Sequence, residues 1–266
     1  MILNDILLHK RKDLEELKQR MPLSRLQRIV ETAPRPKARS FLHAITSGKQ
    51  LNVIAEIKKA SPSHGMIRED FQPLRIANLY EFGGASAISV LTEPHFFKGR
   101  PSYLKTVRQV TSLPLLRKDF ILEKYQIYET AILEADAFLL IASILTEEEL
   151  KEFIALGLSL GMDALVEIHA EPELKKAVDA GAKIIGINNR NLKTLTVDPD
   201  LATNLIPRIP KGIPVVVESG LSTYDELMMY KSLGANAFLV GTTLMKAPDI
   251  VPALQKLLGK KGPGAV

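Results

Sequence analysis

The stretch A-E-I-K-K-A-S-P-S at residues 55–63 contains the end of a strand-like run, which carries charged side chains, and this pattern decides the fold. The residues from Leu51 to Ile57 are mostly apolar, as expected of a buried strand. Glu56, Lys58 and Lys59 fall at its carboxyl end, where charges cost free energy unless water or a ligand reaches them. Similar apolar runs recur along the chain, and several also end in a charged or amide residue. The repetition predicts one site assembled from the ends of many strands.

Eight segments have strand composition, and most are continuous Val, Ile, Leu and Ala runs, which are typical of strands covered on both faces. They are Asn52–Lys58, Ala85–Thr92, Pro114–Asp119, Asp136–Ala142, Asp163–His169, Lys183–Asn188, Ile213–Ser219 and Asn236–Gly241. Helical patterns follow them at 73–83, 101–111, 123–134, 146–160, 171–180, 199–206, 222–233 and 248–258. Eight such units predict a (β/α)8 barrel, the TIM-barrel fold. A doubly wound open sheet is the alternative, but no G-x-G-x-x-G follows the first strand.

The remaining segments are expected to be parts of the same single domain, residues 1–266. Residues 1–48 contain two helical patterns, one of them the stripe of Ile2, Ile6, Leu7, Lys10, Leu14 and Leu17, and the other from Leu23 to Val30. They are too few to build a core of their own, so we predict an N-terminal helical extension packed on the barrel. The tail at 259–266 is predicted to be disordered.

Composition excludes several function classes. Of the 266 residues, 46% are hydrophobic and 24% charged, and no apolar run approaches the roughly 20 residues of a membrane-spanning helix. The chain has no cysteine, so disulfides, thiolate metal sites and cysteine nucleophiles are excluded. A net charge of +5 is weak evidence for nucleic acid, and the K-R-K cluster at 10–12 is interpreted as solvated surface. We expect a cytoplasmic protein with no nucleic-acid or membrane partner, either a monomer or a homodimer.

Charged and amide side chains stand at five of the predicted strand ends. They are Glu56 with Lys58, Lys118 with Asp119, Glu167, Asn188 with Arg190, and Glu218 with Ser219. The carboxyl ends of barrel strands converge on one face, and neighbouring charges there move pKa values apart, so we predict a proton-transfer site. Each charge alone is more often a solvated rim residue or half of a structural ion pair. Asp119 is the member most readily assigned to structure.

A second cluster predicts a phosphate site. V-E-S-G-L at 217–221 and L-V-G-T-T at 239–243 place small residues after strands seven and eight, where barrels commonly bind phosphate. Gly220 and Gly241 let the backbone approach an anion, and Ser219 and Thr242 add hydroxyl donors. His43, His64, His95 and His169 are scattered without ligand spacing, so no metal is expected.

Six motifs resemble those of the indole-3-glycerol-phosphate synthase family. They are the opening stretch, S-V-L-T-E-P-H-F-F-K-G at 89–99, L-L-R-K-D-F-I at 115–121, L-V-E-I-H at 165–169, I-G-I-N-N-R-N-L at 185–192 and V-E-S-G-L. The resemblance covers nearly the whole chain and leaves no room for a second barrel. It implies ring closure, decarboxylation and dehydration of 1-(2-carboxyphenylamino)-1-deoxyribulose 5-phosphate to indole-3-glycerol phosphate, in tryptophan biosynthesis. The resemblance also implies that no cofactor is needed.

The resemblance also implies roles for individual residues. Lys118 is the expected general acid on the substrate carbonyl, and Lys58 the contact of the anthranilate carboxylate. Glu56 and Glu167 are acid/base carboxylates whose division of labour stays open. Asn188 and Glu218 bind sugar hydroxyls or hold the lysines. The implied substrate-binding residues are Arg190, Ser61, Phe97, Phe120, Leu139 and Leu192. The implied phosphate-binding residues are Ser219, Gly220, Gly241 and Thr242.

One position departs from the pattern of the family, and three alternative functions are left open. Some relatives carry a further lysine, which helps to hold the phosphate, at the position of Ala60. The contribution of the first loop to phosphate binding is therefore open. Either Lys59 replaces the missing lysine or the backbone sites suffice. A phosphosugar isomerase is the nearest rival, although such barrels usually use Asp or Cys at the strand ends. A Schiff-base aldolase using Lys118 and a non-catalytic barrel that binds a phosphometabolite are the others.

Overall fold

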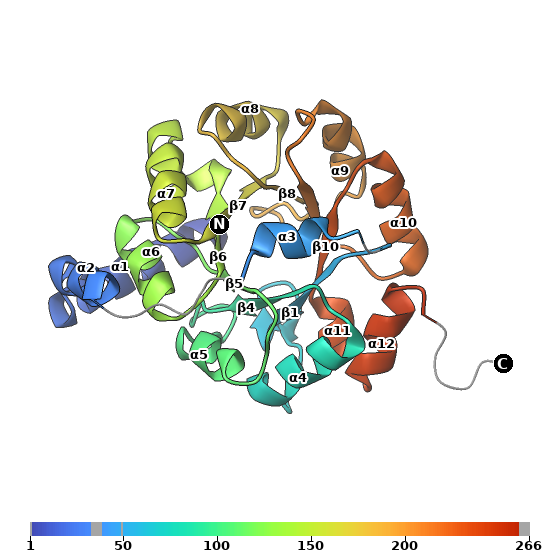
Figure 1. Cartoon of the computed structure of the whole chain (residues 1–266), viewed down its shortest axis with the longest axis horizontal. Helices are drawn as coiled ribbons and strands as arrows, with labels where there is room; N and C mark the ends of the chain where they lie inside the picture. Colours follow the sequence, from blue (N-terminus) through green and yellow to red (C-terminus); the bar gives the residue numbers. More distant parts are fainter. Residues whose placement is uncertain (1, 33–38, 49, 261–266) are drawn as a thin grey trace.

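The computed structural model describes residues 2–32, 39–48 and 50–260. Within them, eight parallel strands close into a barrel in the order β1-β10-β9-β8-β7-β6-β5-β4 (Figure 1). These strands are β1 (Val53–Ile57), β4 (Ala87–Leu91), β5 (Leu115–Lys118), β6 (Ala137–Ile141), β7 (Asp163–Ile168), β8 (Ile185–Asn188), β9 (Val215–Glu218) and β10 (Ala237–Val240). The predicted barrel is confirmed, and each strand lies inside its predicted segment.

Helices surround the strands as a ring (Figure 1). They are α4 (Pro73–Gly83), α5 (Ser102–Arg108), α6 (Lys124–Ile132), α7 (Glu147–Ser159), α8 (Glu171–Asp179), α9 (Asp200–Leu205), α10 (Tyr224–Leu233), α11 (Thr242–Lys246) and α12 (Ile250–Leu257), with 3-10 turns η1 (Ala142–Ile144) and η2 (Ile206–Arg208). All eight predicted helical segments are confirmed. The short helix α11 and a hairpin of β2 (Ala60–Ser61) and β3 (Gly65–Met66) were not predicted.

Local signals set several helix boundaries. Thr146 begins α7 through a capping box with Glu149, because the two side chains satisfy each other's free backbone N–H groups. Helix α10 begins in the same way at Thr223, with Glu226 as the partner, one residue later than Ser222 suggested. Gly84 ends α4 with φ of 99°, a left-handed conformation that glycine adopts without steric cost. The apparent starts and stops in the sequence are therefore physical caps.

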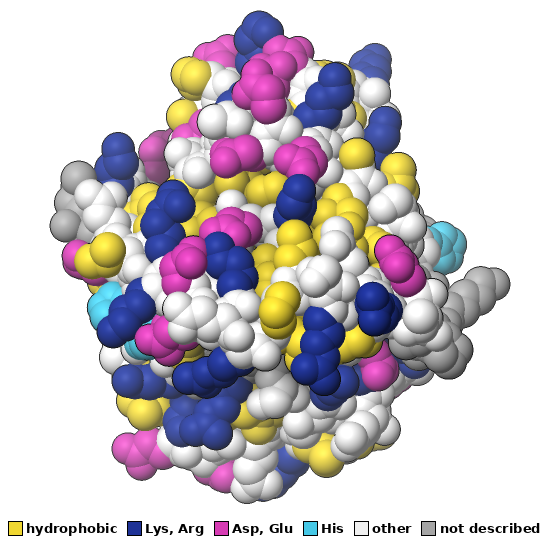
Figure 2. All heavy atoms as spheres, turned by 90° about the vertical axis from the view of Figure 1, so that its left-hand side faces the viewer, with side chains coloured by type: hydrophobic (Ala, Val, Ile, Leu, Met, Phe, Trp, Pro, Cys, Tyr) yellow, Lys and Arg dark blue, Asp and Glu magenta, His cyan; other side chains and the backbone are white. Residues whose placement is uncertain are grey.

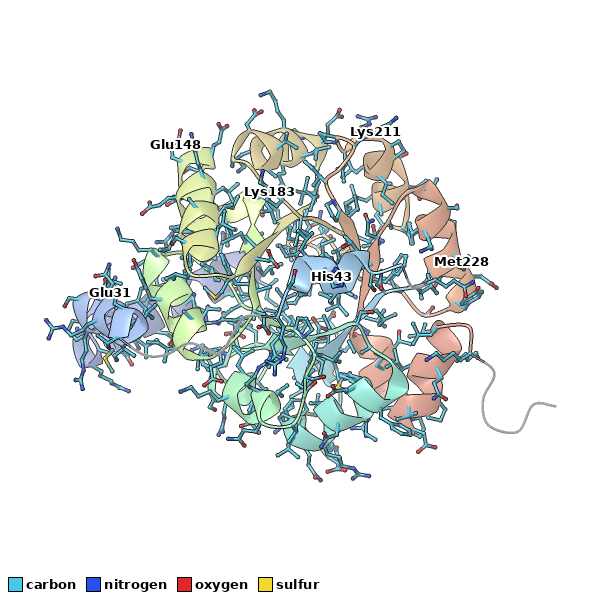
Figure 3. The ribbon with its side chains drawn as sticks, in the orientation of Figure 1. Glu31, His43, Glu148, Lys183, Lys211 and Met228 are labelled. Carbon is cyan, nitrogen blue, oxygen red and sulfur yellow. The ribbon has the colours of Figure 1, made fainter. Side chains whose placement is uncertain are left out.

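The barrel interior and its outer layer form separate cores. The outward faces of the strands pack against the helices, whereas residues such as Ile54, Leu116, Leu165 and Val216 fill the interior below the mouth. Outer helical residues such as Glu148 on α7 lie at the periphery (Figure 3). Because the interior is filled by side chains, a ligand has room only at an end of the barrel.

The N-terminal segment forms three helices, α1 (Ile2–Arg20), α2 (Leu23–Thr32) and α3 (Phe41–Thr46). In α3, which was not predicted, the buried Phe41 and Ile45 pack on residues at the amino ends of the strands, and α3 lies across the ring in Figure 1. In α1, Leu3 and Ile6 pack on residues at the carboxyl ends. The extension therefore contacts both ends of the barrel. Residues 261–266 of the tail lie outside the described residues.

The interpretation of K-R-K at 10–12 as solvated surface was wrong for Lys10. Its ammonium is buried and lies 2.7 Å from the carboxylate of Asp119 at the end of β5. Asp119 also contacts Arg117 at 3.1 Å and accepts a hydrogen bond from Thr92 at 2.6 Å. Burial alone would raise the pKa of Asp119, but Lys10 and Arg117 outweigh it and lower the pKa to about 2. Asp119 thus anchors α1 to the barrel.

We predict that Lys10→Met lowers the free energy of unfolding at neutral pH by about 3 kcal/mol, because one partner of a buried ion pair is lost. Lys12→Met is the matched control, since Lys12 is exposed on the same helix. Urea unfolding measures both. Asp119 contributes stability above its ordinary pKa of 3.8, which is lost as the pH falls toward 2. In Lys10→Met this acid loss should begin at higher pH. Equal stabilities of the two variants would contradict the anchor.

The molecular surface on the side of α1 and α2 mixes charges of both signs. Figure 2 shows Lys and Arg side chains interspersed there with Asp, Glu and apolar groups. Among residues 2–32, 39–48 and 50–260, no helix combines the length and apolarity needed to cross a bilayer.

Candidate active site

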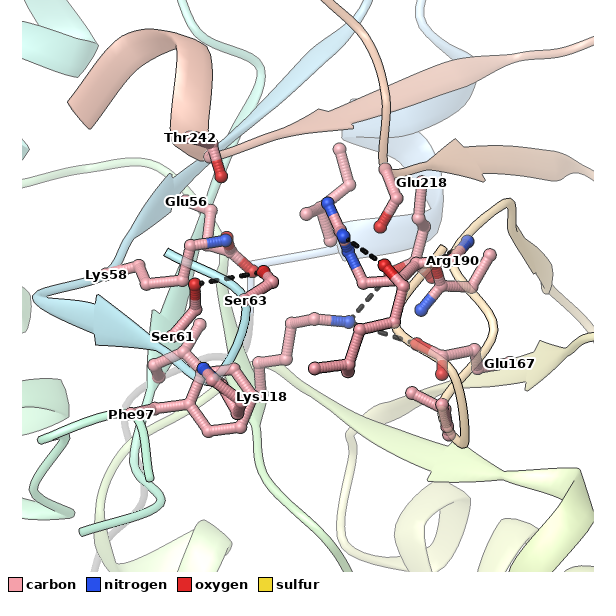
Figure 4. Close-up of a pocket in the computed structure, with 18 of the residues that line it drawn as sticks. Glu56, Lys58, Ser61, Ser63, Phe97, Lys118, Glu167, Arg190, Glu218 and Thr242 are labelled. Carbon is pink, nitrogen blue, oxygen red and sulfur yellow. Dashed lines mark hydrogen bonds and ion pairs between the residues drawn. The ribbon is translucent and has the colours of Figure 1, made fainter. Parts of the chain in front are cut away.

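One cavity of about 300 Å³ lies at the carboxyl ends of the barrel strands, and every residue predicted for the site lines it (Figure 4). The residues come from all parts of the chain. They are Glu56, Lys58, Ser61, Phe97, Lys118, Phe120, Leu139, Glu167, Asn188, Arg190, Leu192, Glu218, Ser219, Gly220, Gly241 and Thr242. The prediction that strand ends meet around one mouth is therefore confirmed as geometry, and their individual roles remain proposals.

Lys118 stands between two carboxylates. Its ammonium lies 2.7 Å from Glu218 and 3.1 Å from Glu167, which extend from β9 and β7 toward it (Figure 4). Burial would lower the pKa of Lys118, but the carboxylates outweigh it and raise the pKa above the usual range. Burial would likewise raise the pKa of Glu167, yet Lys118 and His169 hold it below its usual range. The pair is an ammonium facing an ionised carboxylate.

Glu218 differs from Glu167 in its surroundings. One of its oxygens accepts from Lys118, while its other oxygen is buried and has no hydrogen-bond partner among the residues that the structure describes. Gly186 on the neighbouring strand leaves the space that Glu218 occupies, because a Cβ there would lie 2.5 Å from the partnerless oxygen. Burial and the nearby charge of Glu167 raise the pKa of Glu218 to about 7, although Lys118 opposes them. Glu218 can therefore gain or lose a proton near neutral pH.

A second ion pair lies on the other side of the cavity. The carboxylate of Glu56, at the end of β1, is 2.5 Å from the ammonium of Lys58. Gly241, at the end of β10, makes this pair possible, because a Cβ at that position would lie 2.0 Å from Glu56 and 3.0 Å from Lys58. The glycine predicted for phosphate contact thus has a second role in making space for the Glu56–Lys58 pair.

Aromatic and aliphatic side chains form an apolar wall. The rings of Phe97 and Phe120 lie with centroids 6.3 Å apart, and Leu139 and Leu192 belong to the same cluster. Buried Glu93 holds the loop that carries Phe97, since its carboxylate accepts the backbone N–H of Phe97 at 2.9 Å. The wall has the apolar and aromatic character that is typical of ligand pockets.

The opposite rim of the cavity has small residues and positive charges. Ser219 and Gly220 have φ of 68° and 77°, so the chain turns sharply after β9. Thr242 begins α11, where backbone N–H groups lack partners within the helix. Burial, followed by Lys246, Arg190 and Lys58, lowers the pKa of His64. Lys58 and Arg190 line the cavity as well, so cationic side chains are available to an anionic ligand.

Sequence reasoning missed several residues of the cavity. Ile2, Leu3 and Ile6 of α1 complete the apolar wall. Ile2 and Ile6 were assigned only to packing, and Leu3 was not singled out. Ser63 and His64 enter from the β2–β3 hairpin, with the hydroxyl of Ser63 2.9 Å from the imidazole of His64. The apolar stripe of α1 and the S-P-S-H-G stretch at 61–65 are both visible in the sequence. Neither pattern predicts that its segment contacts the cavity.

Asp119 lines the cavity, but its carboxylate is paired with Lys10 and Arg117. These ion pairs agree with the assignment of Asp119 to a structural role.

Lys59 is half-buried beside the hairpin, where its backbone carbonyl accepts a hydrogen bond from the N–H of Ile67 at 2.9 Å. In the described part of the chain, no group of three or more His, Asp or Glu side chains is arranged to hold a metal ion.

The closed barrel and the cavity at its carboxyl face define a (β/α)8-barrel protein with its site in the usual place. Solved structures agree on the fold. The N-acetylmannosamine-6-phosphate 2-epimerase from Clostridium perfringens matches with a TM-score of 0.60 and 17% identity, over 79% of this chain and 93% of that chain. KGPDC from Streptococcus mutans gives a TM-score of 0.60 at 14% identity, over 78% and 95%.

The family model of indole-3-glycerol phosphate synthase matches residues 3–257. The synthase of that name from Sulfurimonas denitrificans is 48% identical over 97% of this chain and 98% of its own length. The one from Campylobacter jejuni subsp. doylei is also 48% identical, over 97% and 100%. The chain therefore belongs to the indole-3-glycerol phosphate synthase family, whose members are decarboxylating lyases of tryptophan biosynthesis.

Proposed function

We propose that this chain converts 1-(2-carboxyphenylamino)-1-deoxyribulose 5-phosphate to indole-3-glycerol phosphate, carbon dioxide and water, in the cavity around Lys118. The single observation that supports this best is the cluster of Lys118, Glu167 and Glu218 beside an apolar wall and a positive rim. The family places the chain among enzymes, which favours this reading over a non-catalytic phosphometabolite barrel or a phosphosugar isomerase.

Lys118 serves as general acid in ring closure. A bond forms between the ring carbon that carries the carboxylate and the ketone carbon, and the ketone oxygen becomes a hydroxyl. Lys118 is held as an ammonium, so it can donate to that oxygen as it gains negative charge. The same protonation argues against a Schiff base, which requires a free amine. The carboxylate then leaves as carbon dioxide, and its electron pair restores the aromatic ring.

The dehydration step needs an acid for the departing hydroxyl and a base for a proton on the neighbouring methylene carbon. The Glu56–Lys58 pair supplies one carboxylate and one ammonium at 2.5 Å, so the two groups can exchange a proton without solvent. We assign this step to that pair. Lys58 also faces the substrate carboxylate before ring closure, together with Arg190 and Ser61. Asn188 and Glu218 bind the hydroxyls of the sugar chain.

Binding is divided between the two sides of the cavity. The aromatic ring lies against Phe97, Phe120, Leu139 and Leu192, and their low polarity favours expulsion of the carboxylate as neutral carbon dioxide. The phosphate binds to Ser219, Gly220, Gly241 and Thr242. Anchoring the substrate at both ends holds the ring carbon and the ketone carbon near each other, which supplies orientation. The substrate is the only partner we propose, and a biosynthetic enzyme of this kind is expected to act in the cytoplasm.

The double variant Ser219→Ala with Thr242→Ala should raise KM about 10-fold or more and leave kcat within a few-fold, because two hydroxyl donors to the phosphate are lost. Steady-state kinetics measures the separation of the two constants. Thr203→Ala is the control, since Thr203 is half-buried on α9 and does not line the cavity. An unchanged KM would refute the phosphate site.

A fluorescence assay tests the reaction itself. The purified chain is mixed with the carboxyphenylamino-ribulose phosphate, and the indole product is followed by its emission. The proposal expects turnover that saturates with substrate. An isomerised phosphosugar or an unchanged substrate would refute the proposal.

A further inference from the structure

Glu167 is contacted on both of its carboxylate oxygens. Oε2 lies 3.1 Å from the ammonium of Lys118, and Oε1 lies 3.2 Å from Nε2 of His169. Both Glu167 and His169 come from the end of β7, where alternate residues point to the same face of a strand. Lys118 and Oε2 face the cavity, whereas His169 is not among the cavity-lining residues and lies behind Glu167.

Glu173 on α8 holds His169 from the other side. Its Oε2 lies 3.6 Å from Nδ1 of His169 and accepts the backbone N–H of His169 at 2.6 Å. The side chain of His169 is 12% exposed, so both contacts are little screened by water. Burial would lower the pKa of His169, but Glu167 and Glu173 outweigh it and raise the pKa to about 9. Neither ring nitrogen makes a hydrogen bond within the described residues, so the two carboxylates act on the imidazole through their charge, and both favour its protonated form.

The result is a row of alternating charges from α8 to the cavity, in the order Glu173, His169, Glu167, Lys118 and Glu218. The two carboxylates next to Lys118 are not equivalent in this row. Glu167 has a cation on each side, whereas one oxygen of Glu218 has no partner. Glu167 is therefore the fixed member of the row and Glu218 the member that can titrate.

We propose that His169 and Glu173 are positioning residues that keep Glu167 ionised and turned toward Lys118, which leaves Glu218 as the carboxyl that exchanges protons beside Lys118. This inference rests on the proposed function for its kinetic consequences. The charged groups around His169 are Glu167 on β7 and Glu173 on α8. Lys118 from β5 and Glu218 from β9 act on it through Glu167.

His169→Gln removes the positive charge behind Glu167 and keeps a side chain of similar reach. We expect kcat to fall about 10-fold, with KM within about twofold, because the binding groups are untouched. Loss of the cation also raises the pKa of Glu167, so the acid limb of the kcat–pH profile should move to higher pH. His43→Gln is the control, since His43 is exposed on α3 at the other end of the barrel.

Glu173→Gln tests the same row from its outer end. Without Glu173 the pKa of His169 falls, so His169 loses its charge at a lower pH than in the parent protein. The variant should match the parent protein in weakly acidic buffer and lose activity as the pH rises. A purely structural contact would lower activity by the same factor at every pH. Profiles of both variants that superimpose on the parent profile after scaling would overturn the proposal.

An NMR titration of the histidine side chains separates this proposal from the proposed function, because it needs no substrate. His169→Gln assigns the His169 signal by its disappearance. We expect this imidazole to titrate near pH 9 in the parent protein and at lower pH in Glu173→Gln. Titration at the ordinary value of 6.5 would overturn the positioning role even if the enzyme is active. Absence of turnover with a normal His169 titration would instead refute the proposed function alone.

Discussion

Lys118→Ala is expected to lower kcat by at least about 10²-fold, the order of effect for a lost general acid. Lys118 lines the cavity, and two carboxylates hold it in its protonated form. Without it the ketone oxygen gains negative charge beside Glu167 and Glu218, so the barrier to ring closure rises further. Steady-state kinetics with the carboxyphenylamino-ribulose phosphate measures the loss.

Removal of Lys118 also leaves two buried carboxylates without their shared cation, so folding must be checked. Urea unfolding and product affinity by calorimetry provide that check. Lys183→Ala is the matched control, because Lys183 is an exposed lysine that does not line the cavity. Lys118→Ala with retained product affinity and lost turnover supports the assignment. Near-normal turnover of Lys118→Ala would refute it.

Gly241→Ala should have the second large effect, also a loss of at least about 10²-fold in kcat, because it disturbs an acid/base pair. An added Cβ would lie 2.0 Å from Glu56 and 3.0 Å from Lys58. Atoms cannot approach this closely, so the Glu56 carboxylate must move away from Lys58. The loss should appear in kcat more than in stability, since the site lies at the open end of the barrel.

Gly48→Ala is the control for this substitution. A Cβ at Gly48 meets nothing within 4 Å, so the added methyl group itself should have no consequence. A variant Glu56→Gln should resemble Gly241→Ala in kcat, because both remove the carboxylate from its position beside Lys58. Full activity of Gly241→Ala would show that the Glu56–Lys58 pair is not needed at its present separation.

The barrel could be predicted from sequence because its signals are local. Each strand is a short, mostly apolar run, and several helices between the strands begin or end at a recognisable cap or glycine. The eight-fold alternation of strands with helices fits one closed topology. The site followed from the same reasoning. Residues such as Lys118 and Glu218, at the ends of parallel strands, must converge wherever the strands close into a ring. No knowledge of side-chain contacts was needed for that step.

The features that sequence reasoning missed depend on contacts between distant segments. Lys10 sits in a run of three basic residues, and only the docking of α1 places it 2.7 Å from Asp119. The same docking brings Ile6 into the cavity wall. His169 was set aside with the scattered histidines for a different reason. Its neighbours Glu167 and Glu173 are close in sequence, but only the folded structure shows that both carboxylates face the imidazole. A local sequence pattern does not reveal which side chains become buried or which become neighbours in space.

The central claim is that carbon dioxide leaves only after the ring has closed at Lys118. Substrate labelled in its carboxyl carbon tests this claim most directly, with labelled carbon dioxide and indole fluorescence followed in the same reaction. The parent protein should release one labelled carbon dioxide for each indole formed, and Lys118→Ala should release almost none. Labelled carbon dioxide released by Lys118→Ala without indole would contradict the account, because decarboxylation would then not depend on ring closure.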